Sequence, residues 1–448
     1  MKTRSVPFLV LALPLLAHAQ PANPGVLIRN AAIVELDSID PDNHDFADLQ
    51  PLKALIGDAR VVALGEQSHG DGAVFLCKAR LIAFLHEEMG FDVLAWESGI
   101  VPGLEANERI ADPDVPIVDS FAGVFEIWTW SRQVRPVLEY ARSTHETDRP
   151  LIQAGFDSQM TGTNSGDQIG ARIDALTLDG DERPAEVDRA VDHLTRMGEA
   201  DVSEPDAYRA LAADIDAAVA WIDANRQALD ERSTPREVAL TRRSADDAAW
   251  FCRMIADQKE KAEFDVWERD RRMGSNIAFL ANEYFPDKKI ILWAATSHLT
   301  HNPEQISFPA NHDAYSNKTD TAGEGAFRAL GDDLYTIGFT AIRGDVGNVF
   351  AQQSWPLPDP ETGSIEWALG AIAHPFLYLD FRSLPDGHAL RERQNMRPLG
   401  YAPMEAVWPD QMDAVICIET MIKSDQRIDK PDNYELTVGL NAKDAKDR

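Results

Sequence analysis

The feature that most constrains the fold is a pair of short apolar runs separated by a helical pattern. The runs span residues 61–64 and 91–96, and the residues between them carry apolar side chains at 81, 82, 84 and 85, which is helical spacing. Gly90 then supplies a residue that readily adopts the left-handed conformation at a helix end. A strand, a helix and a strand within about 35 residues form a βαβ unit, so at least part of the sheet is predicted to be parallel.

Similar apolar runs recur along the chain, many of them ending in polar or glycine residues. They span residues 151–156, 289–294, 334–341, 376–381 and 414–418. Between 166 and 273 the composition shifts to Ala, Asp, Glu and Arg, and apolar residues fall on single helical faces, as at 208, 211, 215, 219 and 222. We therefore expect an α/β fold with a mixed, largely parallel sheet flanked by helices. Its catalytic core would comprise residues 20–165 and 274–448, with 166–273 as an inserted helical subdomain that serves as scaffold or as a cap over the site.

The first residues have the pattern of a secretory signal peptide. Lys2 and Arg4 precede an apolar stretch over 6–16 that is too short to span a bilayer, and Ala17-His18-Ala19 is a typical cleavage sequence. We expect residues 1–19 to be removed and the mature protein to be periplasmic or secreted.

Charge and cysteine content narrow the classes of partner. The formal net charge of −31 argues against nucleic acid or a stable association with anionic membranes, and is compatible with a neutral or cationic small molecule, so we expect a small-molecule substrate. Cys77, Cys252 and Cys417 each lie in apolar surroundings, which favours buried, inert thiols, although the sequence does not exclude one disulfide or choose its pair. Nothing in the sequence indicates the oligomeric state.

Glu66 and His69 follow the first apolar run and are flanked by Gly65 and Gly70. Ligands bind at the carboxyl ends of strands in α/β proteins, so a strand that leads into a carboxylate and an imidazole predicts an acid/base site. The alternative is a loop in which the two side chains only cap the next helix.

Other acids and histidines also follow predicted strands, and converging strand ends would place Glu66, His69, Glu97, Asp157 and His298 around one cleft. Glu97 closes the second run, Asp157 closes the run over 151–156, and His298 and His301 follow the run over 289–294. A buried carboxylate is costly unless it is paired, which favours Glu97 as a member of the site. Asp157 and His301 fit a substrate-binding role as well as a structural one, in which Asp157 caps the next segment and His301 bonds to backbone.

Taken together, these motifs resemble the erythromycin esterase family over nearly the whole mature chain. The resemblance rests on 65–70 (Gly-Glu-Gln-Ser-His-Gly), a basic residue on the next helix, 90–97, the Trp-Ala-x-x-Ser-His pattern at 293–298, 269–276, 363–366 and 378–382. It implies an α/β core with helical additions and cleavage of a macrolactone ester by water. It also implies His69 as general base beside Glu66 and Glu97, Lys78 in the place of a basic residue that assists the carbonyl, and His298 as a further site histidine.

The chain departs from that family pattern at one strand end. The family usually has Trp-Ala-His-Asn-x-His, whereas Ala295 and Thr296 replace the first His and the Asn here. Lys78 also stands where Arg is expected. We therefore expect a divergent member that hydrolyses an ester, and the sequence does not specify which one.

The chemistry expected of the residues agrees with this resemblance. The chain has no Gly-x-Ser-x-Gly elbow, so water is the natural nucleophile, and an imidazole with an ordinary pKa of about 6.5 suits its deprotonation. No cofactor is expected on this reading. Two alternatives stay open: a Zn²⁺- or Mn²⁺-dependent hydrolase using Glu66, His69, Glu97 and His298, and an exported small-molecule-binding protein without activity.

Overall fold

The computed structural model describes residues 23–161, 165–177, 183–195, 204–261, 266–307, 320–347 and 354–425. The predicted signal peptide lies outside these residues. Within them, no helix is both long enough and apolar enough to cross a bilayer.

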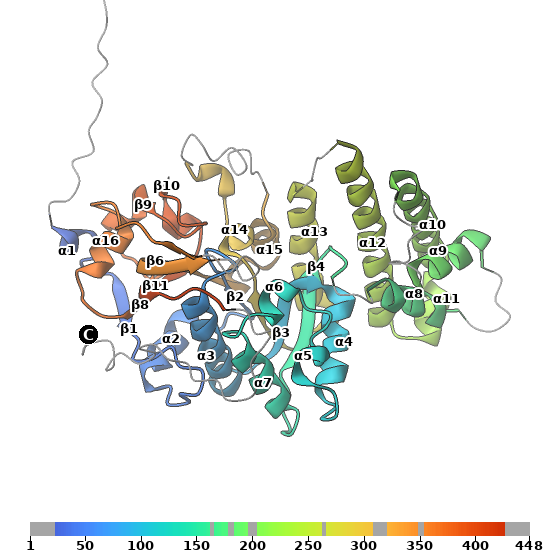
Figure 1. Ribbon diagram of the computed structural model, residues 1–448, viewed down its shortest axis with the longest axis horizontal. Coiled ribbons are helices and arrows are strands. Elements are labelled where there is room, and N and C mark those ends of the chain that lie inside the picture. The colour runs from blue at the N-terminus through green and yellow to red at the C-terminus, as the bar shows by residue number, and fades with distance from the viewer. Residues whose placement is uncertain are drawn as a thin grey trace, which may run out of the picture.

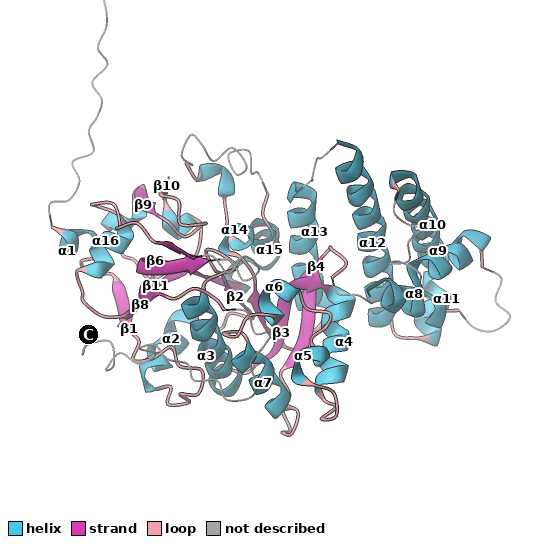
Figure 2. Cartoon of the chain, viewed as in Figure 1, coloured by secondary structure: helices cyan, strands magenta, loops and turns pink. Residues whose placement is uncertain are grey.

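A twisted sheet of nine strands forms the centre of the described chain (Figure 2). Eight strands lie in the order β1 (Ala32–Glu35), β8 (Phe376–Asp380), β11 (Ala414–Met421), β6 (Leu334–Gly347), β2 (Val61–Leu64), β5 (Lys289–Trp293), β3 (Phe91–Gly99) and β4 (Ile152–Asp157). The pairs from β11 to β4 are parallel, whereas β1 and β8 run antiparallel to their neighbours. The ninth strand, β7 (Ser354–Pro356), pairs antiparallel with β6, and β9 (Gln394–Met396) and β10 (Met404–Ala406) form a separate hairpin.

The predicted mixed, largely parallel sheet is therefore confirmed. Each of the seven apolar runs is a strand, with ends within a few residues of those expected except at β6, which continues to Gly347. β1, β7, β9 and β10 were not expected, because three or four residues are too few for a clear period-two pattern.

Successive residues of the central strands enter two different cores. Val62, Leu64 and Trp96 pack with α3 (Gly72–Met89) and α7 (Arg135–Thr144) on one face. Val61 and Ala63 pack with α13 (Val266–Phe279) and α15 (Ala322–Leu330) on the other. This alternation is the period of a strand covered on both faces, and it gives three layers. α3 is buried from Gly72 to His86 and ends at Gly90, which has a φ of 76°.

Further helices and turns surround this core. They are α1 (Pro24–Leu27), α2 (Gln50–Ile56), α4 (Ile100–Ile110), α5 (Ile117–Ser120), α6 (Glu126–Thr129), α14 (Thr296–Leu299), α16 (Ile365–Gly370), a π-helical turn η2 (Leu280–Tyr284) and the 3₁₀ turns η1 (Ala47–Leu49), η3 (Pro303–Gln305), η4 (Gly331–Asp333), η5 (Ala389–Arg391) and η6 (Trp408–Asp410).

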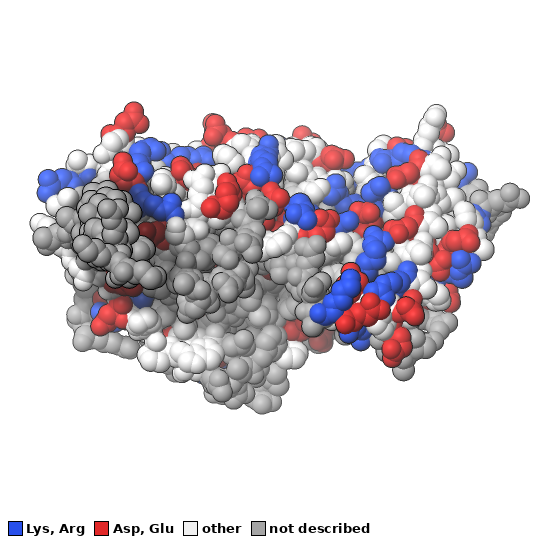
Figure 3. All heavy atoms as spheres, turned by 90° about the horizontal axis from the view of Figure 1, so that it is seen from above, with Lys and Arg blue, Asp and Glu red and all other residues white. Residues whose placement is uncertain are grey.

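A helical bundle extends from the β4 end of the sheet (Figure 1). It comprises α8 (Ser165–Ala175), α9 (Ala185–Thr195), α10 (Pro205–Ala224), α11 (Arg226–Arg232) and α12 (Pro235–Lys261). The bundle has its own core, to which Leu211, Ile215 and Ile222 contribute the face predicted from their spacing. The region α10–α12 fits an insertion, while the exact domain boundaries stay a prediction. Figure 3 shows acidic and basic side chains interleaved on the outer surface of the bundle.

The three cysteines are buried and unpaired, as expected for inert thiols. Burial raises the pKa of Cys77 and of Cys252 to about 12 each. Neither thiol is therefore ionised near neutral pH, which is consistent with a packing role.

Candidate active site

The register of four parallel strands gathers the predicted site residues at one edge of the sheet. Leu64 on β2 and Trp96 on β3 both lie opposite Trp293 on β5, and Trp96 also lies opposite Gly155 on β4. After this row come Glu66 on the β2 side, Glu97 on β3 and Asp157 on β4, while residue 295 follows β5. Carboxylates from three strands therefore come close to the segment that leads to His298. Sequence reasoning had predicted this convergence, and its physical cause is the common direction of the strands.

Gly65 allows the first of these loops to pass close to its neighbour. A Cβ atom there would lie 2.3 Å from the hydroxyl of Thr296 and 3.2 Å from its Cα, closer than packing permits. The backbone N–H of Thr296 in turn donates to the carbonyl oxygen of Glu66 at 2.8 Å. The glycine therefore lets two strand ends meet.

The first half of the site, which we call the Glu66 cluster, consists of Glu66, His69, Lys78 and Trp128. The Glu66 carboxylate is fully buried. Its Oε1 lies 2.9 Å from His69 Nδ1 and accepts a hydrogen bond of 2.8 Å from the indole N–H of Trp128. Its Oε2 accepts a hydrogen bond from Lys78 Nζ. A buried charge is tolerable when it is compensated in this way.

His69 is the accessible member of the Glu66 cluster, with 35% of its side chain exposed. Its ring stands at 90° to the Trp128 ring, with the centroids 5.4 Å apart. Burial by itself would lower the pKa of His69, but the hydrogen bond and charge of Glu66, together with Glu97, outweigh burial and raise it. The imidazole is thus oriented through one nitrogen and can act as a base.

Lys78 is enclosed. Its side chain has no exposed surface, and its ammonium group contacts Glu66, lies 4.2 Å from the centre of the Trp293 ring and lies 3.3 Å from the carbonyl oxygen of Ala294. Burial lowers the pKa of Lys78, although Glu66 opposes this shift. These contacts suit a residue that holds Glu66 in place, and the carbonyl-assisting role implied by the resemblance stays a prediction.

The second half of the site, the Glu97 cluster, consists of Glu97, Asp157, Arg269, Asp270 and His298. Arg269 donates to both carboxylate oxygens of Asp157, at 3.1 and 2.7 Å, and to Glu97 Oε1 at 2.9 Å. His298 Nδ1 lies 2.5 Å from Asp270 Oδ1, and its Nε2 lies 3.3 Å from Glu97 Oε1. The cluster therefore places three carboxylates around one guanidinium and one imidazole.

Glu97 is ionised because its neighbours outweigh its burial. Burial would raise its pKa, but His298, Arg269, His69 and the backbone N–H of Ala295 lower it to about 2. That N–H donates to Glu97 Oε2 at 3.0 Å. Ala295, where the family pattern has histidine, thus contributes to the site through its backbone.

His301 has a different set of contacts. Its Nε2 lies 3.2 Å from the hydroxyl of Thr336, its ring stacks on Phe327 at 4.6 Å, and its backbone N–H donates to the carbonyl oxygen of Gln411. Burial lowers the pKa of His301 to about 4, so the ring is neutral at physiological pH. These contacts describe a packed core histidine, and its predicted part in substrate binding stays a prediction.

Sequence reasoning gave no role to Trp128, Arg269 or Asp270. In the sequence, Arg269 and Asp270 stand out only as part of the family pattern, because they lie on α13 and no strand leads into them. Trp128 lies on α6, a single helical turn, and no local pattern there indicates contact with Glu66. A buried carboxylate such as Glu66 is expected to need several hydrogen-bond donors, but the sequence does not indicate which residues provide them.

The donor arrangement does not fit the metal-dependent alternative. Both oxygens of Glu66 accept from Trp128 and Lys78, and both oxygens of Glu97 accept from Arg269 and a backbone N–H. A Zn²⁺ or Mn²⁺ site needs such oxygens, or imidazole nitrogens, directed at a common point. Within the ranges that the structure describes, no three His, Cys, Asp or Glu side chains are so arranged.

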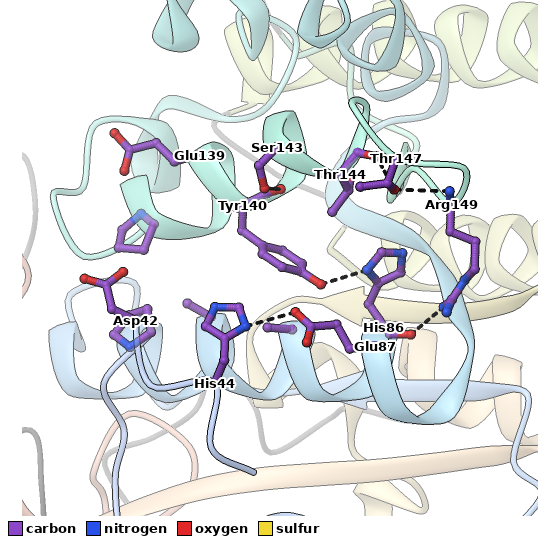
Figure 4. A pocket seen from close by; sticks show the side chains of 14 residues that line it. Asp42, His44, His86, Glu87, Glu139, Tyr140, Ser143, Thr144, Thr147 and Arg149 are labelled. Carbon is purple, nitrogen blue, oxygen red and sulfur yellow. Dashed lines mark hydrogen bonds and ion pairs between the residues drawn. The ribbon is translucent and has the colours of Figure 1, made fainter.

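A cavity of about 650 Å³ lies elsewhere, between α3, α7 and the loop that carries Asp42 (Figure 4). In it, His44 Nδ1 lies 3.0 Å from Glu87, and His86 Nδ1 lies 2.7 Å from the hydroxyl of Tyr140. None of its lining residues belongs to the Glu66 or Glu97 cluster. We therefore locate the candidate active site by its chemistry and not by the volume of this cavity.

Comparison with known proteins finds relatives that align with most of this chain. The chain is 25% identical over 407 residues to the protein YbfO of Bacillus subtilis (strain 168), an alignment that covers 86% of this chain and 89% of YbfO. It is 23% identical over 425 residues to erythromycin esterase type II of Escherichia coli, covering 84% of this chain and 93% of that protein.

A solved structure supports the fold. A mutant of the erythromycin esterase EreC in its open conformation superposes with a TM-score of 0.68 at 18% identity, and the match covers 89% of this chain and all of that one. The model of the erythromycin esterase family matches residues 86–421. That match spans most of the chain, including Glu97, Arg269 and His298, and on this ground the chain belongs to the erythromycin esterase family.

Proposed function

We propose that the protein is an exported hydrolase that cleaves an ester by general-base activation of water. The observation that carries this proposal is the pairing of a partly exposed imidazole, His69, with the buried carboxylate of Glu66 at 2.9 Å. This pairing fixes Nδ1 as the nitrogen that faces the carboxylate and assigns proton transfer to Nε2. Membership of the erythromycin esterase family supports the same reaction class.

The reaction follows from these roles. Nε2 of His69 removes a proton from water while the water oxygen attacks the ester carbonyl carbon. The tetrahedral oxyanion then collapses, the bond to the alkoxide breaks, and the imidazolium returns its proton to the departing oxygen. Glu66 stabilises the transient imidazolium through its contact with Nδ1, while Lys78 and Trp128 donate hydrogen bonds to the same carboxylate and hold it in place.

The oxyanion needs donors near His69. Arg269 and His298 are each 11% exposed at the side chain, whereas Lys78 is fully enclosed. We assign charge stabilisation to Arg269 and His298, and a well-placed donor of this kind contributes ~3–4 kcal/mol. Lys78 then acts on the substrate only through Glu66.

Macrocyclic lactones are the first substrate class to test, because a type II erythromycin esterase is among the relatives. The purified protein would be incubated with a panel of macrolides and simple esters, and products would be identified by a mass gain of one water. We expect His69→Ala to abolish the reaction, since no other partly exposed imidazole faces Glu66 among the described residues.

His44→Ala is the matched control, because His44 is a surface histidine that pairs with Glu87 outside both clusters. Loss of turnover in His69→Ala, with ligand affinity retained, separates an enzyme from a binding protein. No water gain by the parent protein across a broad panel would defeat the proposal.

Export is part of the proposal and has its own test. Removal of residues 1–19 predicts Gln20 as the first residue of the protein recovered from the periplasm or medium. N-terminal sequencing of that protein checks it, and an intact Met1 on a cytoplasmic product would contradict it.

A further inference from the structure

Trp128 is held deep in the candidate active site by a segment outside the sheet. It lies on α6, is 1% exposed, and reaches across 62 positions of sequence to donate its indole N–H to Glu66. An indole has one polar group, which is a donor. Here that N–H donates to the carboxylate that orients His69, and not to a backbone carbonyl.

The acceptor atom is shared. Oε1 of Glu66 lies 2.8 Å from the indole nitrogen of Trp128 and 2.9 Å from His69 Nδ1. Oε2 is occupied by Lys78. Two donors therefore share one carboxylate oxygen, and the indole ring stands perpendicular to the imidazole ring.

We propose that Trp128 is a positioning residue for the proposed reaction: by sharing Oε1 of Glu66 with His69, its indole N–H limits how strongly that carboxylate retains a proton on the imidazole. This inference rests on the proposed role of His69 as general base. It assigns to Trp128 a function in setting the working pH range of the site, beyond packing.

The physical reason is the balance between two hydrogen bonds to one anion. A donor to a carboxylate stabilises its charge and makes the oxygen a weaker acceptor for any second donor. Without the indole N–H, Glu66 would hold the imidazolium more tightly, and a larger fraction of His69 would be protonated and inactive at a given pH. The other titratable groups that act on His69 in this balance are Glu97, Arg269, Lys78 through Glu66, and Asp71, a buried carboxyl whose pKa burial raises to about 8.

Trp128→Phe tests the idea because it removes the N–H and retains an aromatic ring. We expect the acidic limb of the kcat/KM profile against pH to move upward by ~0.5–1 pH unit, since hydrogen bonds to charged groups are worth more than neutral ones. Activity should then fall about three- to tenfold at a pH below that limb and little well above it. KM should change less than kcat.

Trp408→Phe is the matched control. Trp408 is equally buried, and its indole N–H donates at 2.8 Å to the carbonyl oxygen of Gln394, outside both clusters. We expect Trp408→Phe to leave the acidic limb in place. A loss of packing alone would lower the activity of Trp128→Phe by the same factor at every pH. That result, or an acidic limb that does not move in Trp128→Phe, overturns the proposal.

A second measurement works without any substrate. The imidazole of His69 can be titrated by NMR in the parent and in Trp128→Phe, with its signal assigned from a His69→Ala spectrum. An upward shift in Trp128→Phe alone supports the shared-oxygen mechanism even if the ester substrate is not found. Identical titration curves overturn it, and they leave the hydrolase proposal to be decided by the substrate screen.

Discussion

The two halves of the site use charge in opposite ways. The Glu66 cluster has one buried carboxylate that binds a lysine, an indole and the accessible imidazole. The Glu97 cluster has three carboxylates around an arginine and a histidine. In the Glu66 cluster, loss of Glu66 leaves the enclosed Lys78 without its partner. In the Glu97 cluster, loss of Glu97 leaves other carboxylates that still neutralise Arg269. The two acid–histidine pairs of this site are therefore expected to differ in their tolerance to substitution.

Replacing Glu66 should have the largest effect. Glu66→Gln leaves Lys78 buried without an anion, which typically costs ~3–5 kcal/mol of stability, and it removes the group that orients His69. We expect catalytic activity to fall by about 10³-fold or more, by analogy with loss of the acid in a catalytic triad. Chemical denaturation and initial rates measure the two effects.

The double variant Glu66→Gln/Lys78→Met separates the loss of stability from the loss of activity. It removes both charges and retains bulk, so stability should recover while activity should not. Recovery of activity in the double variant would show that Glu66 only compensates Lys78.

Glu97→Gln should be milder and should move the pH profile in the other direction. Arg269 keeps its two bonds to Asp157, so we expect a stability loss of ~1–2 kcal/mol. Because Glu97 raises the pKa of His69, its neutralisation should shift the acidic limb of kcat/KM downward, opposite to Trp128→Phe. Shifts of the same sign in both variants would contradict this electrostatic account.

Acid should remove the stability that ionised Glu97 provides. Its folded pKa of about 2 lies below the ordinary value of 4.5, so this stability is present above pH 4.5 and is lost as the pH falls toward 2. The difference corresponds to at most ~3 kcal/mol. Denaturation at stepwise lower pH should show a smaller decline in Glu97→Gln than in the parent, and parallel curves would count against this assignment.

His301→Gln should have the smallest effect on activity. His301 bonds to Thr336 and stacks on Phe327, so its replacement should cost ~1–2 kcal/mol of stability and change kcat/KM less than threefold. Denaturation and initial rates check this outcome. A rise in KM of tenfold or more would instead support the substrate-binding role predicted from the sequence.

The sequence allowed part of this arrangement to be predicted. Apolar runs located seven strands, and the common direction of parallel strands then implied that Glu66, Glu97, Asp157 and the loop of His298 converge. The positions of Trp128 and Arg269 could not be predicted, because their contacts with Glu66 and Asp157 span 62 and 112 positions, and no local periodicity encodes such contacts. The enclosure of Lys78 could not be predicted either, since it depends on the packing of α3 between the sheet and other helices.

The position of β2 in the sheet affects how the protein is made. Its neighbours β5 and β6 lie more than 200 positions later in the chain, so β2 leaves the ribosome long before either of its edges can be paired. Until β5 and β6 have been synthesised, the buried environment of Glu66 and Lys78 is incomplete. An apolar strand with two unpaired edges is also prone to association with other chains. Nascent chains that stop before β5 therefore lack the strand ends that complete the candidate site, and they expose an unpaired apolar strand.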